Sequence, residues 1–156
     1  EIDIPSANES IAVQLSDGRV MQNIRHQSGE SKNRIVAISS DGGAKWDTTY
    51  FDAQLPSPVC QASIIDYTTR DGQKILLFPN PNSTEKREKM TVRVSFDDGQ
   101  TWPISRLIRS SGSAYSDLVI AGDGEIGLLY EQGNGGGIHY AQFNESWLMG
   151  DRDKKE

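Results

Sequence analysis

The sequence predicts an all-β fold built from consecutive antiparallel hairpins. Its apolar runs are short, rich in β-branched residues and evenly spaced, and none keeps the 3.6-residue period of an amphipathic helix. Asp-Gly pairs separate many of these runs and supply the positive φ angles that tight hairpin turns need. A longer turn motif occurs twice, at a spacing of 56 residues. These observations predict repeated four-stranded units, which are typical of β-propeller blades.

The expected strands follow the apolar runs in order along the chain. They cover residues 11–15, 19–24, 34–39, 62–66, 74–78, 90–96, 104–108, 117–121, 126–130 and 138–143. Each repeat contains two hairpin turns and therefore four strands, so the 156 residues hold about three blades. We expect residues 1–150 to form a partial β-propeller and residues 151–156 to form a charged tail.

Three blades do not close a propeller, which needs about four to eight. They leave sheet edges open, and open edges invite pairing with another chain. We therefore expect about half of a propeller, associated with its other half or with another chain. A self-contained β-sandwich of about ten strands also fits the length, but it does not require the 56-residue repeat.

The composition is that of an ordinary globular protein, with 35% hydrophobic and 24% charged residues and a net charge of −6. Without a Lys/Arg-rich face, neither nucleic acid nor an anionic membrane is an expected partner. No apolar run reaches about 18 residues, so we expect no membrane span. Cys60, His26 and His139 are far apart in the sequence, so we expect no metal site and no cofactor.

The repeated turn has the pattern Ser-x-Asp-x-Gly-x-Thr-Trp. Its two copies comprise Ser39, Asp41, Gly43 and Trp46, and Ser95, Asp97, Gly99 and Trp102. The carboxylate can accept local backbone N–H bonds, the glycine can adopt a positive φ, and the tryptophan can pack over the hairpin. We therefore assign these residues a structural role. The first copy has Lys45 in place of the threonine, which should weaken one contact of the turn.

This turn resembles the Asp box of sialidases, and further segments resemble the same family in the same order. Ala-Tyr-Ser around Tyr115 is similar to the stretch with the nucleophilic tyrosine, and Leu-Tyr-Glu ends at Glu131, in the place of an arginine-orienting glutamate. Asn-Glu-Ser around Glu9 resembles the stretch with the tyrosine's glutamate partner. Arg25 and Arg87 match the second and third arginines of the substrate clamp. The resemblance implies the C-terminal half of a six-bladed exo-α-sialidase propeller.

The chemistry of a sialoside suits these residue types. Its anomeric carbon carries a carboxylate, which guanidinium groups such as those of Arg25 and Arg87 bind bidentately. The same charge repels a carboxylate nucleophile, and sialidases use a tyrosine instead, an exception to the usual pair of carboxylates. A free phenol ionises only near pH 10, so Tyr115 needs a base, for which Glu9 is the candidate. Hydrolysis would then retain the anomeric configuration.

Other parts of such a site have no match in this sequence. The resemblance implies a first clamp arginine and an acid/base aspartate from earlier blades, and it implies that Glu131 pairs with that arginine. Gln61 is a possible substrate contact, although a buried amide that satisfies strand ends explains it equally well. Four further arginines are expected to be solvated or strand-flanking charges. They are Arg19, Arg34, Arg70 and Arg93.

The leading hypothesis is therefore an exo-α-sialidase that releases terminal sialic acid from sialylated glycans. An intramolecular transferase that forms an anhydro-sugar would use the same residues. The rival from another class is a non-catalytic Asp-box propeller that binds glycan or protein. Asn8 opens a glycosylation sequon beside Glu9, where a glycan would block the site, so the enzyme hypothesis favours a bacterial source that attaches no glycan there. For such a source we expect a secreted or periplasmic location. The first five residues lack a signal peptide, so the protein is either not exported or begins elsewhere.

Overall fold

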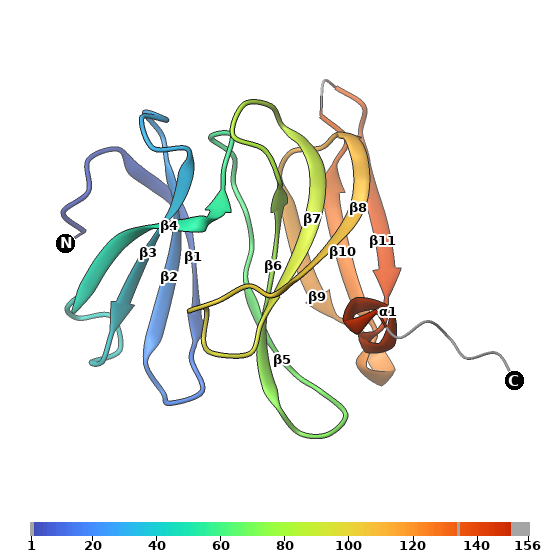
Figure 1. Ribbon diagram of the computed structural model, residues 1–156, viewed down its shortest axis with the longest axis horizontal. Coiled ribbons are helices and arrows are strands. Elements are labelled where there is room, and N and C mark those ends of the chain that lie inside the picture. Colours follow the sequence, from blue (N-terminus) through green and yellow to red (C-terminus); the bar gives the residue numbers. More distant parts are fainter. Residues whose placement is uncertain (1, 134, 151–156) are drawn as a thin grey trace, which may run out of the picture.

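The computed structural model describes residues 2–133 and 135–150, which form three antiparallel sheets side by side (Figure 1). The first sheet has the order β1 (Ala7–Gln14), β2 (Val20–His26), β3 (Asn33–Ser39) and β4 (Thr48–Pro56). The second has the order β5 (Ile65–Thr68), β6 (Lys74–Pro81), β7 (Glu88–Ser95) and β8 (Ile104–Gly112). The third contains β9 (Ser116–Ile120), β10 (Ile126–Glu131) and β11 (Ile138–Phe143), with β10 in the middle.

The all-β prediction is confirmed, with three differences in detail. The third sheet has three described strands rather than four. The strand β4 was not expected, because only Asp52 and Leu55 are buried within it and its sequence shows little apolar alternation. A short helix, α1 (Glu145–Met149), follows β11, and Asn144 caps its first turn. The predicted charged tail, residues 151–156, lies outside the described residues.

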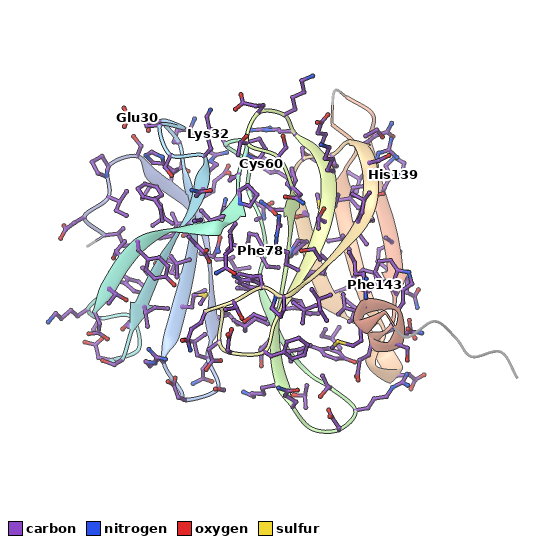
Figure 2. All side chains as sticks on the ribbon, in the orientation of Figure 1. Glu30, Lys32, Cys60, Phe78, His139 and Phe143 are labelled. Carbon is purple, nitrogen blue, oxygen red and sulfur yellow. The ribbon has the colours of Figure 1, made fainter. Side chains whose placement is uncertain are left out.

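Two apolar layers hold the three sheets together. The layer between the first and second sheets includes Leu15, Val36 and Phe78, and Phe78 lies near the middle of the molecule in Figure 2. The layer between the second and third sheets includes Val92 and Leu128. Nearly all these side chains are under a tenth exposed, and burial of each contributes about 1.5–3 kcal/mol. Two cores therefore lie on the two faces of the middle sheet, and a smaller cluster of Ile24, Ile35 and Ala37 lies in the first sheet.

The two Asp boxes have matching geometry. In the first, Oδ1 of Asp41 accepts a hydrogen bond from the Lys45 backbone N–H at 2.9 Å, and Gly43 has a φ of 93°. In the second, Oδ1 of Asp97 accepts from the Thr101 backbone N–H at 2.8 Å. The Thr101 hydroxyl adds a bond of 2.6 Å to Asp97, which the lysine of the first box does not supply. The structural role predicted for both turns agrees with these local bonds.

Two arginines that were expected to be solvated or to flank strands are buried in the sheets. Arg34 is 0% exposed, and it donates to Oδ1 of Asn23 at 2.7 Å and to the Cys60 carbonyl at 2.6 Å. Arg93 is 4% exposed and donates to Oδ1 of Asn80 at 2.6 Å. Burial lowers the pKa of Arg34 to about 9 and that of Arg93 to about 10, so both stay cationic at neutral pH. The expectation of solvated charges was wrong because amide and carbonyl oxygens replace water here.

The direction of the strands gives the molecule two different ends. Successive strands are antiparallel, so odd-numbered strands begin and even-numbered strands end on one side, at the top of Figure 1. The Asp boxes join β3 to β4 and β7 to β8 on the other side. No helix among residues 2–133 and 135–150 is long and apolar enough to cross a membrane.

Candidate active site

Tyr115 lies at the centre of a cluster at the end opposite the Asp boxes. Its hydroxyl donates to Oε1 of Glu9 at 2.8 Å and accepts from Nη1 of Arg25 at 3.0 Å. Nη1 of Arg25 also lies 2.6 Å from Oε2 of Glu9, which makes an ion pair. The structure thus brings together a phenol, a carboxylate and a guanidinium from the segment before β9, from β1 and from β2.

A bulge in β1 directs two successive side chains toward Arg25. The pairing of β1 with β2 is irregular between Ala7 and Ser10, and such a bulge interrupts the usual alternation of side chains. Oδ1 of Asn8 accepts from Nε of Arg25 at 3.0 Å, while Glu9 pairs with the same guanidinium. Sequence reasoning missed Asn8 as an orienting residue, because strict alternation would place it on the face opposite to Glu9.

Arg25 is held firmly in this cluster. Its side chain is 10% exposed and makes bonds through Nε and Nη1. Within the part of the chain that the structure describes, its Nη2 has no hydrogen-bond partner. The Nη2 group therefore remains able to donate to an anion.

Arg87 approaches Tyr115 from the second sheet. It directly precedes β7, and its guanidinium carbon lies 5.4 Å from the centre of the Tyr115 ring, a cation–π distance. Nη2 of Arg87 donates to the Val59 carbonyl at 2.9 Å. Both predicted clamp arginines are therefore within reach of Tyr115, one at its hydroxyl and the other over its ring.

The backbone around Tyr115 is bonded on both sides. Its N–H donates to Oε2 of Glu131 at 3.2 Å, and its carbonyl accepts from the Glu131 backbone N–H at 2.9 Å. The side chain of Gln61 bonds to the backbone of Ser116, the next residue. Glu131 was expected to orient an arginine from outside the chain, and within the described residues its carboxylate accepts from Tyr115. Gln61 was expected as a substrate contact, and its amide bonds the protein backbone.

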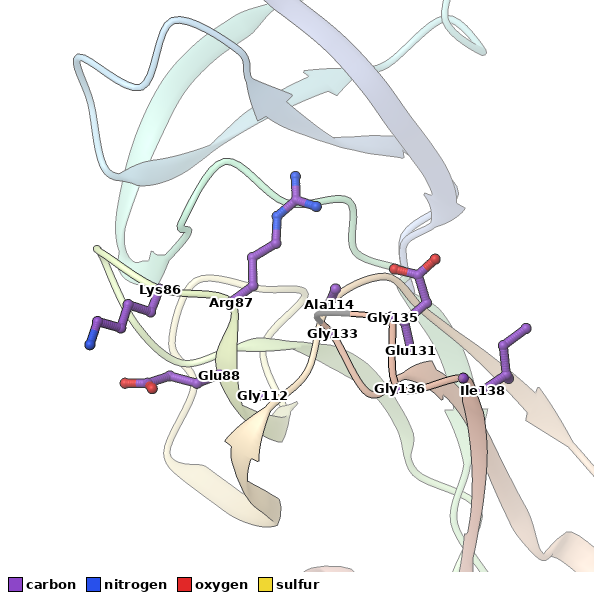
Figure 3. Close-up of a pocket in the computed structure, with 11 residues that line it drawn as sticks. Lys86, Arg87, Glu88, Gly112, Ala114, Glu131, Gly133, Gly135, Gly136 and Ile138 are labelled. Atoms are coloured by element: carbon purple, nitrogen blue, oxygen red, sulfur yellow. The ribbon is translucent and has the colours of Figure 1, made fainter.

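Two open cavities adjoin the cluster. One, of about 990 Å³, lies between the segments that precede β7 and follow β10, and is lined by Arg87 and Glu131 (Figure 3). The other, of about 450 Å³, is lined by Tyr115, Gln61 and Glu131. Ligand sites are commonly clefts of about 300–1,000 Å³ with a few convergent polar groups. Both cavities have that character, and together they flank the Tyr115 segment.

The geometry permits nucleophilic catalysis by a phenol. A base within about 2.6–3.2 Å can take the hydroxyl proton, and Glu9 meets that distance. Cys60, the other nucleophile nearby, is 1% exposed, and burial raises the pKa of its thiol to about 11. A buried thiol that stays protonated is a poor nucleophile. Among the described residues, no group of three or more His, Cys, Asp or Glu side chains could hold a metal ion.

Comparison with known proteins gives a consistent result. The model of the BNR repeat-like domain matches residues 2–128. A sialidase of Micromonospora viridifaciens is 45% identical over 148 residues, which cover 92% of this chain and 22% of that protein. A sialidase of Bacteroides fragilis is 35% identical over 133 residues, covering 81% of this chain and 24% of the relative.

Solved structures agree with the sequence relatives. The Hadza microbial sialidase Hz136 superimposes with a TM-score of 0.81 at 30% identity, covering 92% of this chain and 28% of that one. The intramolecular trans-sialidase of Ruminococcus gnavus gives a TM-score of 0.78 at 26% identity, with coverage of 92% and 33%. The chain thus spans about a quarter to a third of the length of these proteins.

The fold and these comparisons define a segment of a sialidase-type β-propeller. Within that class, the chain belongs to the family of BNR repeat-like domains, and it is similar to part of proteins named as sialidases. The predicted family and the predicted partial propeller are both confirmed. The number of blades in the whole propeller stays a prediction.

Proposed function

We propose that the chain supplies the nucleophile, its base and two substrate-binding arginines of an exo-α-sialidase that hydrolyses terminal sialic acid. The observation that carries this proposal is the contact of the Tyr115 hydroxyl with both Glu9 and Arg25. A phenol packed only for its apolar ring needs one polar partner, and here it has a base and a cation. Relatives named as sialidases support the same assignment.

Substrate binding would rest on Arg25 and Arg87. The Nη2 group of Arg25 has no partner among the described residues and is available to a carboxylate, with which a guanidinium forms stronger charge-assisted bonds than a neutral donor does. Arg87 adds positive charge over the Tyr115 ring. A sialoside carboxylate bound between them would place the anomeric carbon beside the tyrosine oxygen.

Reaction would proceed in two displacements with net retention. Glu9 accepts the phenolic proton while the Tyr115 oxygen bonds to the anomeric carbon and the bond to the leaving oxygen breaks. The leaving oxygen takes a proton from an acid. Water then attacks the same carbon and gives one proton to the conjugate base of that acid, the bond to Tyr115 breaks, and Glu9 returns its proton to the phenolate. Each step conserves charge without a carboxylate nucleophile next to the substrate's carboxylate.

The proposal assigns the acid and a further clamp arginine to residues outside this chain. The carboxylate of Glu131 lines both cavities and is exposed, so an arginine from an adjoining blade could reach it. An open face of the third sheet supports completion by further blades. Ile138 and Tyr140 of β11 are 69% and 54% exposed, and large apolar side chains exposed together on one strand are typical of a surface that another element covers.

A non-catalytic propeller that binds glycan is the rival function. It needs the arginines but not the bond between Glu9 and Tyr115. An intramolecular trans-sialidase is a second enzymatic alternative, because the Ruminococcus gnavus enzyme is among the similar structures. Product analysis separates the two enzymes, since only the transferase releases an anhydro-sugar.

Turnover of a fluorogenic α-sialoside tests the proposal. The protein, with its completing blades, should release the fluorophore, and Tyr115→Phe should lose at least about a thousandfold in kcat because it lacks the attacking oxygen. Tyr50→Phe is the matched control, because it removes a hydroxyl from an exposed tyrosine of β4 that lines neither of the two cavities beside Tyr115. Equal turnover by the wild type and Tyr115→Phe would overturn the nucleophile assignment. Sialoside binding without any turnover would favour the binding propeller.

A further inference from the structure

Gln61 forms an unusual pair of bonds with the residue that follows Tyr115. Its Oε1 accepts from the Ser116 backbone N–H at 2.9 Å, and its Nε2 donates to the Ser116 carbonyl at 3.1 Å. The amide thus engages both backbone groups of one residue, as a paired residue of an antiparallel ladder would. Both ends of the amide are used inside the protein.

The backbone of the same segment is anchored in the first sheet. The carbonyl of Cys60, next to Gln61, accepts from the buried Arg34 at 2.6 Å. The Ser57 N–H donates to the Lys32 carbonyl at 2.7 Å, at the start of the same connection. Residues 57–61 are therefore fixed to the first sheet at both ends, although they form no strand.

Val59, in the middle of this segment, reaches Arg87, which was matched to the third clamp arginine. Its carbonyl accepts from Arg87 at 2.9 Å. Its φ is 55°, in the left-handed region that β-branched residues avoid. Such a strained conformation persists only where the surrounding contacts hold the backbone in place, and strained residues are concentrated at functional sites. Here the strained residue directs its carbonyl at a guanidinium that packs on the Tyr115 ring.

We propose that residues 57–61 form a brace that fixes Tyr115 relative to Arg87, with Gln61 as its positioning residue. This inference rests on the proposed function of Tyr115 and deepens it. Gln61 acts through the backbone of Ser116 rather than by touching the substrate. Among the described residues, no side-chain hydrogen bond joins Arg87 to Tyr115 directly, so the brace links Arg87, through Val59, to the same first sheet to which the Tyr115 hydroxyl bonds through Glu9 and Arg25.

Amide hydrogen exchange tests the brace without needing activity. Gln61→Leu keeps the size of the side chain but removes both bonds, so the Ser116 N–H should exchange at least about tenfold faster. Gln54→Leu is the matched control, because the Gln54 amide also bonds two backbone groups, the Trp102 N–H at 3.2 Å and the Gln100 carbonyl at 2.9 Å. It should accelerate exchange at Trp102 and leave Ser116 unchanged. Unchanged exchange of Ser116 in Gln61→Leu would overturn the brace.

Kinetics with the fluorogenic α-sialoside then separate positioning from substrate contact. A misplaced nucleophile lowers kcat, and displacement by about 1 Å can cost up to a hundredfold. Gln61→Leu should therefore lose at least about tenfold in kcat with KM within about twofold, while Gln54→Leu retains both. A rise in KM with kcat unchanged would identify Gln61 as a substrate contact and contradict the proposal. Should the wild type show no turnover, the proposed function fails, and hydrogen exchange alone still decides the brace.

Discussion

Tyr115 and Glu9 are neighbours in space although they are 106 residues apart in the sequence. Neither residue is unusual by type, since exposed carboxylates and half-buried tyrosines are common in β proteins. Their 2.8 Å contact gives each a specific chemical task. Arg25 bonds to both and fixes their relative orientation, so three residues form one unit rather than three separate contacts.

Replacing Glu9 by glutamine isolates the role of the base. The substitution keeps the size of the side chain and one hydrogen bond to the phenol, but an amide cannot accept the proton. We expect Glu9→Gln to lower kcat by about 10²–10⁴, the usual contribution of general acid–base catalysis. Glu30→Gln changes an exposed glutamate elsewhere and should leave kcat unchanged. A Glu9→Gln protein with wild-type kcat would exclude Glu9 as the base.

For single residues, the sequence predicted the cluster of Tyr115, Glu9 and Arg25 only through the family resemblance. Composition and periodicity do not place Glu9 beside Tyr115, because their contact depends on how three sheets are arranged. Asn8 was missed because a bulge changes the facing of its side chain. Arg34 was expected to be solvated, since a strand pattern does not show that Asn23 and a carbonyl would take the place of water.

The two Asp-box turns differ at one position that bonds to the aspartate. The second box has a hydroxyl bond from Thr101 to Asp97 at 2.6 Å, and the first has Lys45 at that position. We expect Lys45→Thr to raise the free energy of unfolding by about 0.5–1 kcal/mol through one added hydrogen bond. Thr101→Lys should lower it by a similar amount. Urea unfolding measures both, and changes of the same sign would contradict the equivalence of the turns.

The first box also predicts a pH dependence of stability. The Lys45 backbone N–H, followed by the Ser39 hydroxyl, holds the pKa of Asp41 below its usual value of 3.8. A depressed carboxyl pKa stabilises the fold above the unfolded pKa, and this stability is lost as the pH falls through the folded pKa. The free energy of unfolding should therefore decline below about pH 4, and less steeply in Asp41→Asn. Asp3→Asn removes an exposed carboxylate outside the turn. If it reduced the decline of the free energy of unfolding at acid pH as much as Asp41→Asn does, the assignment to Asp41 would be wrong.

The strands were predictable to the extent that they are buried. Nine of the ten expected runs coincide with observed strands, because each places apolar side chains in a core layer. The expected strand 62–66 overlaps β5 at only two residues, since its buried side chains, Ala62 and Ile64, precede the strand. The strand β4 was not expected, since most of its side chains are exposed at the edge of the first sheet. The helix α1 has five residues, too few to show a helical period.

The whole molecule carries a net charge of −6, which opposes long-range attraction of an anionic sugar. Capture of a sialoside must therefore depend on the local field of Arg25 and Arg87. Arg25 is largely buried, and buried charges are screened much less than exposed ones.

This charge distribution predicts a shallow salt dependence of binding. Between about 50 and 500 mM NaCl, KM for the α-sialoside should rise by no more than about threefold, because dissolved salt screens mainly the exposed charges. Arg25→Ala should raise KM far more at every salt concentration. A steep rise of the wild-type KM with salt would contradict capture by a partly buried clamp.

Covalent capture tests most directly whether Tyr115 is the nucleophile. A sialosyl donor with fluorine next to the anomeric carbon slows both displacements, because the transition states resemble an oxocarbenium ion. After incubation with the completed enzyme and acid quenching, mass spectrometry of the digested protein should find one sialosyl unit on the peptide that contains Tyr115. Tyr115→Phe should carry none. An active wild-type enzyme with the sialosyl group on another residue, or an inverted product, would contradict the nucleophilic role of Tyr115.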